Sequence, residues 1–120
     1  MFLFIPGPSH GGDLELKDRA GEYDVEIRLS RNPPVIGKNP VEVQIKDPSG
    51  QAIKVTGVAI NYYMPPMPRM APMNYVIQAE ADRAKYRATL NFVMSGPWVI
   101  AVKISAAGKI RTAKFHVDVP

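Results

Sequence analysis

The sequence predicts an all-β protein, an immunoglobulin-like antiparallel β-sandwich of about seven strands. From about residue 13 onward, apolar and polar residues alternate in short segments, as they do in half-buried strands. Twelve prolines and nine glycines interrupt these segments, and no window keeps apolar residues at helical spacing over ten residues without such a break. Turn signals at intervals of about ten residues favour the sandwich, with an up-and-down or Greek-key barrel as the alternative.

The alternation places the strands in order along the chain. They are expected at residues 23–30, 41–46, 53–63, 75–80, 86–92, 98–104 and 115–119, and Leu14 and Leu16 suggest a further edge strand. The segment 98–104, which begins with Trp98, is the best candidate for the central core strand. Asp47–Gly50 predicts a type I turn. The apolar residues of 53–63 change parity around Gly57, which predicts a β-bulge there.

Length and composition are those of one ordinary domain. The 120 residues are too few for two independent cores, and the 46% hydrophobic and 22% charged residues are near the values of soluble globular proteins. Residues 1–12, rich in glycine and proline, predict a flexible N-terminal lead-in, and residues 13–120 a single domain. The chain has no cysteine, which excludes disulfides, thiolate metal sites and thiol nucleophiles.

Charge and hydropathy limit the compartments and partners. The net charge is +4, but the basic residues are scattered, so we expect no nucleic-acid partner. The apolar start, Met1–Ile5, is too short for a secretory signal or a membrane span. The native protein is therefore expected to be either cytosolic or extracytoplasmic, in the latter case with a targeting segment or anchor absent from this chain.

Catalytic signatures are missing from the sequence, so we expect no enzyme, no small-molecule substrate and no catalytic residues. The chain has two histidines: His10 precedes the domain, and His116 alternates with Asp118 on what should be the solvent face of the last strand. That pair is expected to be an ordinary surface pair, because a catalytic histidine needs a pocket and an oriented partner. No phosphate-binding glycine loop or histidine cluster is present.

One segment is not explained by the fold. Between residues 64 and 73, methionines recur at every third position, at Met64, Met67, Met70 and Met73, among four prolines. Proline favours polyproline II, whose three-residue turn would place these thioethers on one side. Thioether sulfur is a soft, neutral ligand that suits Cu(I), with Ag(I) as the alternative.

Geometry limits this hypothesis. On a straight polyproline segment, methionines three residues apart stand roughly 9 Å from one another, which is too far for several to share one ion. The loop would have to bend, or Met94 from a neighbouring loop would have to complete the site. Metal should not be required for folding, because the alternating strands already supply a core.

Other interpretations of the methionines remain open. They could fill an irregular core, although a proline-rich loop rarely lies in one, or form an adaptable surface for a protein partner or a membrane. Chance composition is a further possibility. Arg69 disfavours a nearby cation unless its side chain points away.

Several short motifs, in this order and at these intervals, resemble the YtkA-like family of small extracytoplasmic β-sandwich domains. The resemblance covers most of residues 22–106. It rests on Tyr23-Asp24-Val25, Gly37-Lys38-Asn39-Pro40-Val41, Asp47-Pro48-Ser49-Gly50, Met64-Pro65-Pro66-Met67, Tyr86-Arg87-Ala88 and the closing run Phe92-Val93-Met94-Ser95-Gly96-Pro97-Trp98.

The resemblance implies an immunoglobulin-like fold, export or membrane anchoring, and association with copper handling or heavy-metal efflux. A copper-trafficking or efflux membrane protein is then the expected partner, and the periplasm or another extracytoplasmic space the expected location. Carried over by position, the metal-site residues are Met64, Met67, Met70, Met73 and Met94. Family loops are richer in glycine and methionine than this one, which has Arg69 and additional prolines. Trp98 is expected to be a core tryptophan, with a cation–π contact to a bound ion as the alternative.

Overall fold

The computed structural model describes residues 13–66, 68–69 and 72–120, and within these its elements are β-strands. The expected lead-in, residues 1–12, lies outside the described residues. The strands are β1 (Leu14–Ala20), β2 (Tyr23–Leu29), β3 (Gly37–Lys46), β4 (Gly57–Tyr63), β5 (Asn74–Gln78), β6 (Glu80–Asp82), β7 (Lys85–Phe92), β8 (Gly96–Ala106) and β9 (Lys109–Val119). The described part contains no helix long and apolar enough to cross a bilayer.

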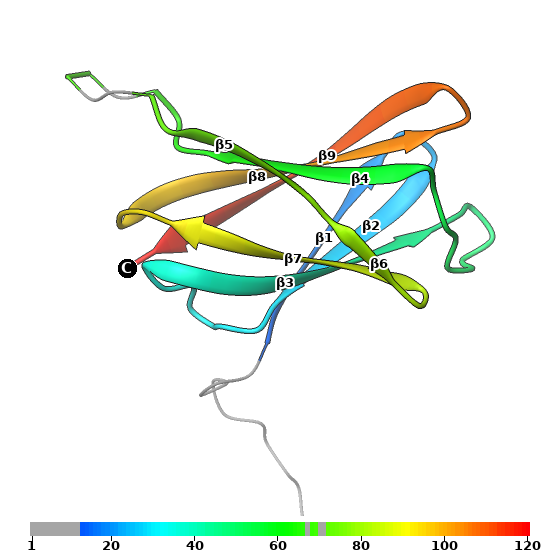
Figure 1. The fold of residues 1–120 in the computed structure, drawn as a ribbon, viewed down its shortest axis with the longest axis horizontal. Coiled ribbons are helices and arrows are strands. Elements are labelled where there is room, and N and C mark those ends of the chain that lie inside the picture. Colours follow the sequence, from blue (N-terminus) through cyan, green and yellow to red (C-terminus); the bar gives the residue numbers. More distant parts are fainter. Residues whose placement is uncertain (1–12, 67, 70–71) are drawn as a thin grey trace, which may run out of the picture.

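The strands form two antiparallel sheets that face each other (Figure 1). One sheet has five strands in the order β1-β2-β3-β7-β6, and the other has four in the order β5-β4-β8-β9. The chain crosses between the sheets after β3, β5 and β7. The prediction of an all-β antiparallel sandwich of the immunoglobulin-like class is confirmed.

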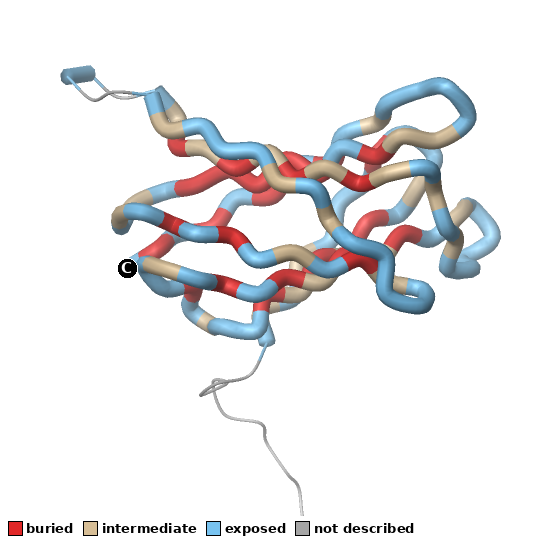
Figure 2. Tube along the Cα trace, in the orientation of Figure 1, coloured by how far each residue is buried: buried red, intermediate tan, exposed pale blue. Residues whose placement is uncertain are grey.

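Period-two alternation produces the core, because successive side chains of a strand point to opposite faces. In β3, Val41, Val43 and Ile45 are buried, while the residues between them are exposed or half-buried. β8 lies inside its sheet and buries Trp98 and the apolar residues at alternate positions after it. The buried positions of both sheets therefore line the space between them, as the red segments of Figure 2 show. The prediction that 98–104 is a central core strand is confirmed.

Two details of the strand assignment differ from expectation. The described residues contain nine strands rather than about seven: the further edge strand suggested by Leu14 and Leu16 is present as β1, and the short β6 was not expected. The predicted bulge at Gly57 is wrong: β4 begins at this residue. Ile53 and Val55 precede the strand and still pack against the core. Their apolar character thus reflects the packing of this segment against the core, and the Ile53 backbone N–H donates to the Ile45 carbonyl oxygen at 3.0 Å.

Polar side chains organise two of the loops. Asp47 accepts the turn bond from the Gly50 backbone N–H at 2.9 Å through its carbonyl oxygen, which agrees with the predicted turn. Its carboxylate accepts from the Ser49 hydroxyl at 2.6 Å and from the Gln51 backbone N–H at 3.0 Å. The Ser49 hydroxyl, followed by the Gln51 N–H, lowers the pKa of Asp47, because both bonds stabilise the charged form.

Asn39 is the polar residue in the described core, and it fixes the loop before β3. Its side-chain oxygen accepts from the Val35 N–H at 2.9 Å, and its amide nitrogen donates to the carbonyls of Val35 at 2.7 Å and Gly37 at 2.8 Å. A fully buried amide with three bonds to one loop holds that loop in a single shape.

Replacing Trp98 with Ala should lower the free energy of unfolding by about 3–5 kcal/mol, because a large side chain that is 1% exposed would leave a cavity. Urea unfolding of wild type and variant measures the difference. A loss below about 1 kcal/mol would contradict the placement of Trp98 in the core.

Candidate metal centre

The methionine-rich loop lies at one end of the sandwich (Figure 1). It joins β4 to β5, and the strand pair nearest the loop is Tyr63 of β4 with Asn74 of β5. The Met64 backbone N–H donates to the Met73 carbonyl oxygen at 3.1 Å, which extends the antiparallel pairing one step into the loop. The first and last methionines of the series are therefore held side by side at the backbone.

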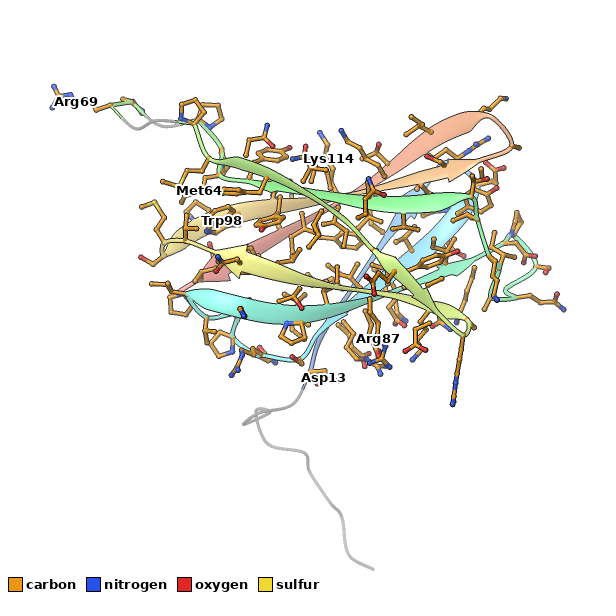
Figure 3. All side chains as sticks on the ribbon, in the orientation of Figure 1. Asp13, Met64, Arg69, Arg87, Trp98 and Lys114 are labelled. Carbon is orange, nitrogen blue, oxygen red and sulfur yellow. The ribbon has the colours of Figure 1, made fainter. Side chains whose placement is uncertain are left out.

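Met64 belongs to the core. Its side chain is 7% exposed and lies beside Trp98, as Figure 3 shows. A Cβ added at Gly96 would stand 2.7 Å from the Met64 Cε, so the methyl group occupies the space that the missing side chain leaves. Gly96 also has a φ of +127°, a conformation that other residues rarely adopt.

Met94 reaches the same end from the turn between β7 and β8. The Trp98 indole Nε1–H donates to the Met94 carbonyl oxygen at 3.0 Å and so ties this turn to the core. Met94 and Met73 are both half-buried and pack against the core. The Met64–Met73 backbone bond, the Met64 methyl group at Gly96 and the Trp98–Met94 bond thus place three of the predicted ligands, Met64, Met73 and Met94, at the same end of the core.

Four aromatic rings cluster at this end of the core, and we refer to them as the aromatic floor. Trp98 lies 5.1 Å from Phe92, 6.0 Å from Tyr62 and 6.3 Å from Tyr75 between ring centroids. Tyr62 stacks on Tyr75 at 5.4 Å. The Tyr62 hydroxyl accepts from the Asn91 backbone N–H at 3.2 Å and connects the floor to the opposite sheet. The bonded Tyr62 hydroxyl and Trp98 indole N–H, together with the ring contacts, hold Trp98, Tyr62 and Phe92 in place.

The structure thus brings together part of the predicted site. Met64, Met73 and Met94 lie at one end, while Met67 and Met70 lie outside the described residues. The expectation that a proline-rich loop stays outside the core is wrong for Met64. The bend that a shared site would require is present at the loop ends, where Met64 and Met73 are hydrogen-bonded.

The remaining polar candidates do not gather into a site. His116 and Asp118 are exposed on β9, as predicted. Among residues 13–66, 68–69 and 72–120, no group of three or more His, Cys, Asp or Glu could hold a metal ion. Methionine sulfur is therefore the donor type that this end of the described fold offers to a soft ion.

Two contributions were missed from the sequence: the space at Gly96 and the aromatic floor. The sequence signal for the space at Gly96 is the glycine itself, which lies between Met94 and Trp98. No local signal indicates that Met64, more than thirty residues earlier in the chain, fills that space.

A family model described as YtkA-like matches residues 17–103. This chain belongs to the YtkA-like family. The crystal structure of the PmoD soluble domain from Methylocystis sp. ATCC 49242 (Rockwell) is similar, with a TM-score of 0.62 over 92% of this chain and 100% of that one. At 12% identity, this likeness concerns the fold alone. A search of curated proteins found no match.

The YtkA-like motifs have structural roles in this chain. Asn39 bonds the loop before β3, and Asp47 bonds the turn after it. The Tyr86 hydroxyl accepts from the Val55 backbone N–H at 2.8 Å and fixes the segment before β4. Gly96 and Trp98 hold the end that carries the methionines. Residues of these motifs therefore hold the loops between the strands in place.

Gly96→Ala should displace the Met64 methyl group and strain the backbone. Gly50→Ala is the matched control, because Gly50 also has a positive φ but nothing within 4 Å of an added Cβ. Both variants should lose about 1–3 kcal/mol of unfolding free energy. The methyl NMR signal of Met64 should move in Gly96→Ala and stay in place in Gly50→Ala; an unmoved signal in Gly96→Ala would refute the role of Gly96.

Proposed function

We propose that this chain is an extracytoplasmic, non-enzymatic domain that binds Cu(I), or Ag(I), through methionine thioethers for storage, buffering or transfer. The ligands would come from Met64, Met67, Met70, Met73 and Met94, and the partner would be a copper-trafficking or efflux membrane protein. The observation that carries the proposal is that Met64, Met73 and Met94 lie at one end of the sandwich, the end that holds the packed rings of Trp98 and Phe92.

The chemistry of the donors supports a soft ion. Thioethers carry no proton to lose, so they are ready to bind at any physiological pH, and they favour Cu(I) over harder ions. A half-buried position removes competing water from such a weak neutral ligand. The association of YtkA-like domains with copper handling, implied by the sequence motifs, agrees with this choice.

The charge of Arg69 opposes cation binding less than the sequence suggests. Arg69 is exposed and lies at the tip of the loop, away from Met64 and Trp98 (Figure 3). Since exposed charges are screened over about 8–10 Å of salt solution, a guanidinium at the tip has little effect on an ion near the core.

The alternative is a non-catalytic interaction module that docks on an efflux or membrane complex through the Met/Pro loop. One observation favours it: β5, which follows the loop, is an edge strand that leaves Val76 65% exposed and Tyr75 37% exposed. Such an edge accepts a further strand from a partner. In this case Met64 would serve packing alone.

Sulfur replacement separates the two functions. Methionine and leucine have similar volume, so leucine at Met64, Met67, Met70 and Met73 together should change unfolding stability by less than about 1.5 kcal/mol. The wild-type protein should compete with a chromophoric chelator for Cu(I), and the leucine variant should not. Met94→Leu alone should weaken competition if Met94 completes the site.

Two further variants serve as controls. Ile110→Leu changes an exposed apolar residue of β9 at the opposite end and should leave the titration unchanged. Arg69→Gln should tighten binding slightly, by less than about threefold, because its charge is screened. Identical titrations of wild type and the four-leucine variant would reject Cu(I) binding by the loop and leave the docking function.

A further inference from the structure

β5 is an edge strand with unpaired backbone groups on its outer side. The Ala79 backbone N–H donates to the Val58 carbonyl oxygen at 2.9 Å, which fixes the residues that bond to β4. Because hydrogen-bonded pairs alternate along an antiparallel ladder, every second residue before Ala79 also directs its backbone groups to β4. The residues between them direct their N–H and C=O groups away from the sheet: Asn74, Val76 and Gln78. No strand among the described residues pairs with this side of β5.

The other edge strands carry charge, whereas β5 does not. In the described part of the chain the edge strands are β1, β6, β5 and β9. β1 and β9 lie beside each other, since the Lys114 backbone N–H donates to the Asp18 carboxylate at 3.0 Å. β6 is 3 residues long and contains Glu80 and Asp82. The sequence of β5 has neither a charge nor a proline, which are common protections of an exposed edge.

Local contacts hold β5 in the extended conformation that strand pairing requires. The Asn61 side-chain nitrogen donates to the Asn74 side-chain oxygen, and also to the Tyr75 carbonyl oxygen at 2.9 Å. The Tyr75 ring stacks on the Tyr62 ring with 5.4 Å between their centroids. An edge that is already ordered loses little conformational entropy when a further strand binds.

An antiparallel second copy of β5 fits this edge. The outward-directed residues are centred on Val76, so a two-fold axis there places Val76 opposite the partner's Val76 and Asn74 opposite the partner's Gln78. The two Val76 side chains, each 65% exposed in the single chain, would cover each other, and the opposed amides can bond. On the inner face, the same register places Tyr75, 37% exposed, opposite the partner's Ile77. The side chains that meet are therefore uncharged on both faces.

We propose that two copies of this chain pair antiparallel through β5 and join their four-stranded sheets into one continuous sheet. Such an interface is isologous, because the same strand supplies both sides. A strand of another protein would need its own matching uncharged register, whereas a second copy supplies that register by symmetry. The pairing does not depend on Cu(I) binding. Because a strand of 5 residues buries less surface than a standard interface, the dimer should be weak and depend on concentration.

Sedimentation equilibrium without metal, from about 10 µM to about 1 mM protein, tests the dimer. The wild-type protein should shift from monomer to dimer over this range. Val76→Lys removes the apolar contact and places like charges opposite each other at the two-fold axis, so it should weaken association by about tenfold or more. Ile110→Lys is the matched control, because Ile110 of β9 is 70% exposed and lies away from β5, and it should associate like wild type.

Two further measurements locate the contact. The Val76 backbone N–H should be protected from hydrogen exchange at high protein concentration and exchange freely at low concentration, while the Ile77 N–H, which faces β4 in both states, should change little. The Cα atoms of a hydrogen-bonded pair stand about 5.5 Å apart, which is within disulfide range. Since the chain has no cysteine, oxidation should cross-link Val76→Cys and leave Ile110→Cys monomeric.

The proposal is overturned by a protein that stays monomeric at every concentration, by self-association that Val76→Lys leaves unchanged, or by an equal loss of association in Ile110→Lys. Unfolding of each variant is compared with wild type to exclude a loss of fold. Protection of the Val76 N–H in a monomer would also overturn it and would assign the edge to another segment of the same chain.

Discussion

The packing of Trp98 at the start of β8 is the interaction on which the methionine-bearing end of the sandwich depends. Its ring contacts Phe92 and Tyr62, and its indole N–H holds the Met94 turn at 3.0 Å. Gly96 lets the chain enter β8 at a φ of +127° and leaves room for Met64. One buried ring thus fixes the turn, the end of the methionine loop and the floor between them. Thioethers placed by such a core would need little reorganisation to bind the proposed ion.

Much of the fold could be predicted from the sequence because its strands are half-buried and alternate strictly. Val41, Val43 and Ile45 are an example, since one face of β3 is core and the other solvent. The strand prediction failed where an apolar residue packs against the core without being paired in a strand. Val55 is apolar because it packs against the core from a loop, where the Tyr86 hydroxyl satisfies its N–H, and alternation cannot distinguish this from a strand.

The candidate site was predictable in composition and less so in three dimensions. The spacing of the methionines and the position of Met94 are visible in the sequence. The burial of Met64 is not, because it depends on the missing side chain at Gly96, across the sheet pairing of β4 and β8.

Met64 lies in the core, whereas Arg69 is exposed at the tip of the methionine loop, so the candidate site and this positive charge are separated (Figure 3). The central claim is that thioethers at the methionine-bearing end of the sandwich bind a soft cation. Methionine-methyl NMR during titration with Ag(I), which is redox-stable and diamagnetic, measures this directly. The account predicts that the methyl signals of Met64, Met73 and Met94 shift together and saturate at a fixed stoichiometry, while that of Met1 does not. Signals that remain unmoved at excess Ag(I) would contradict it.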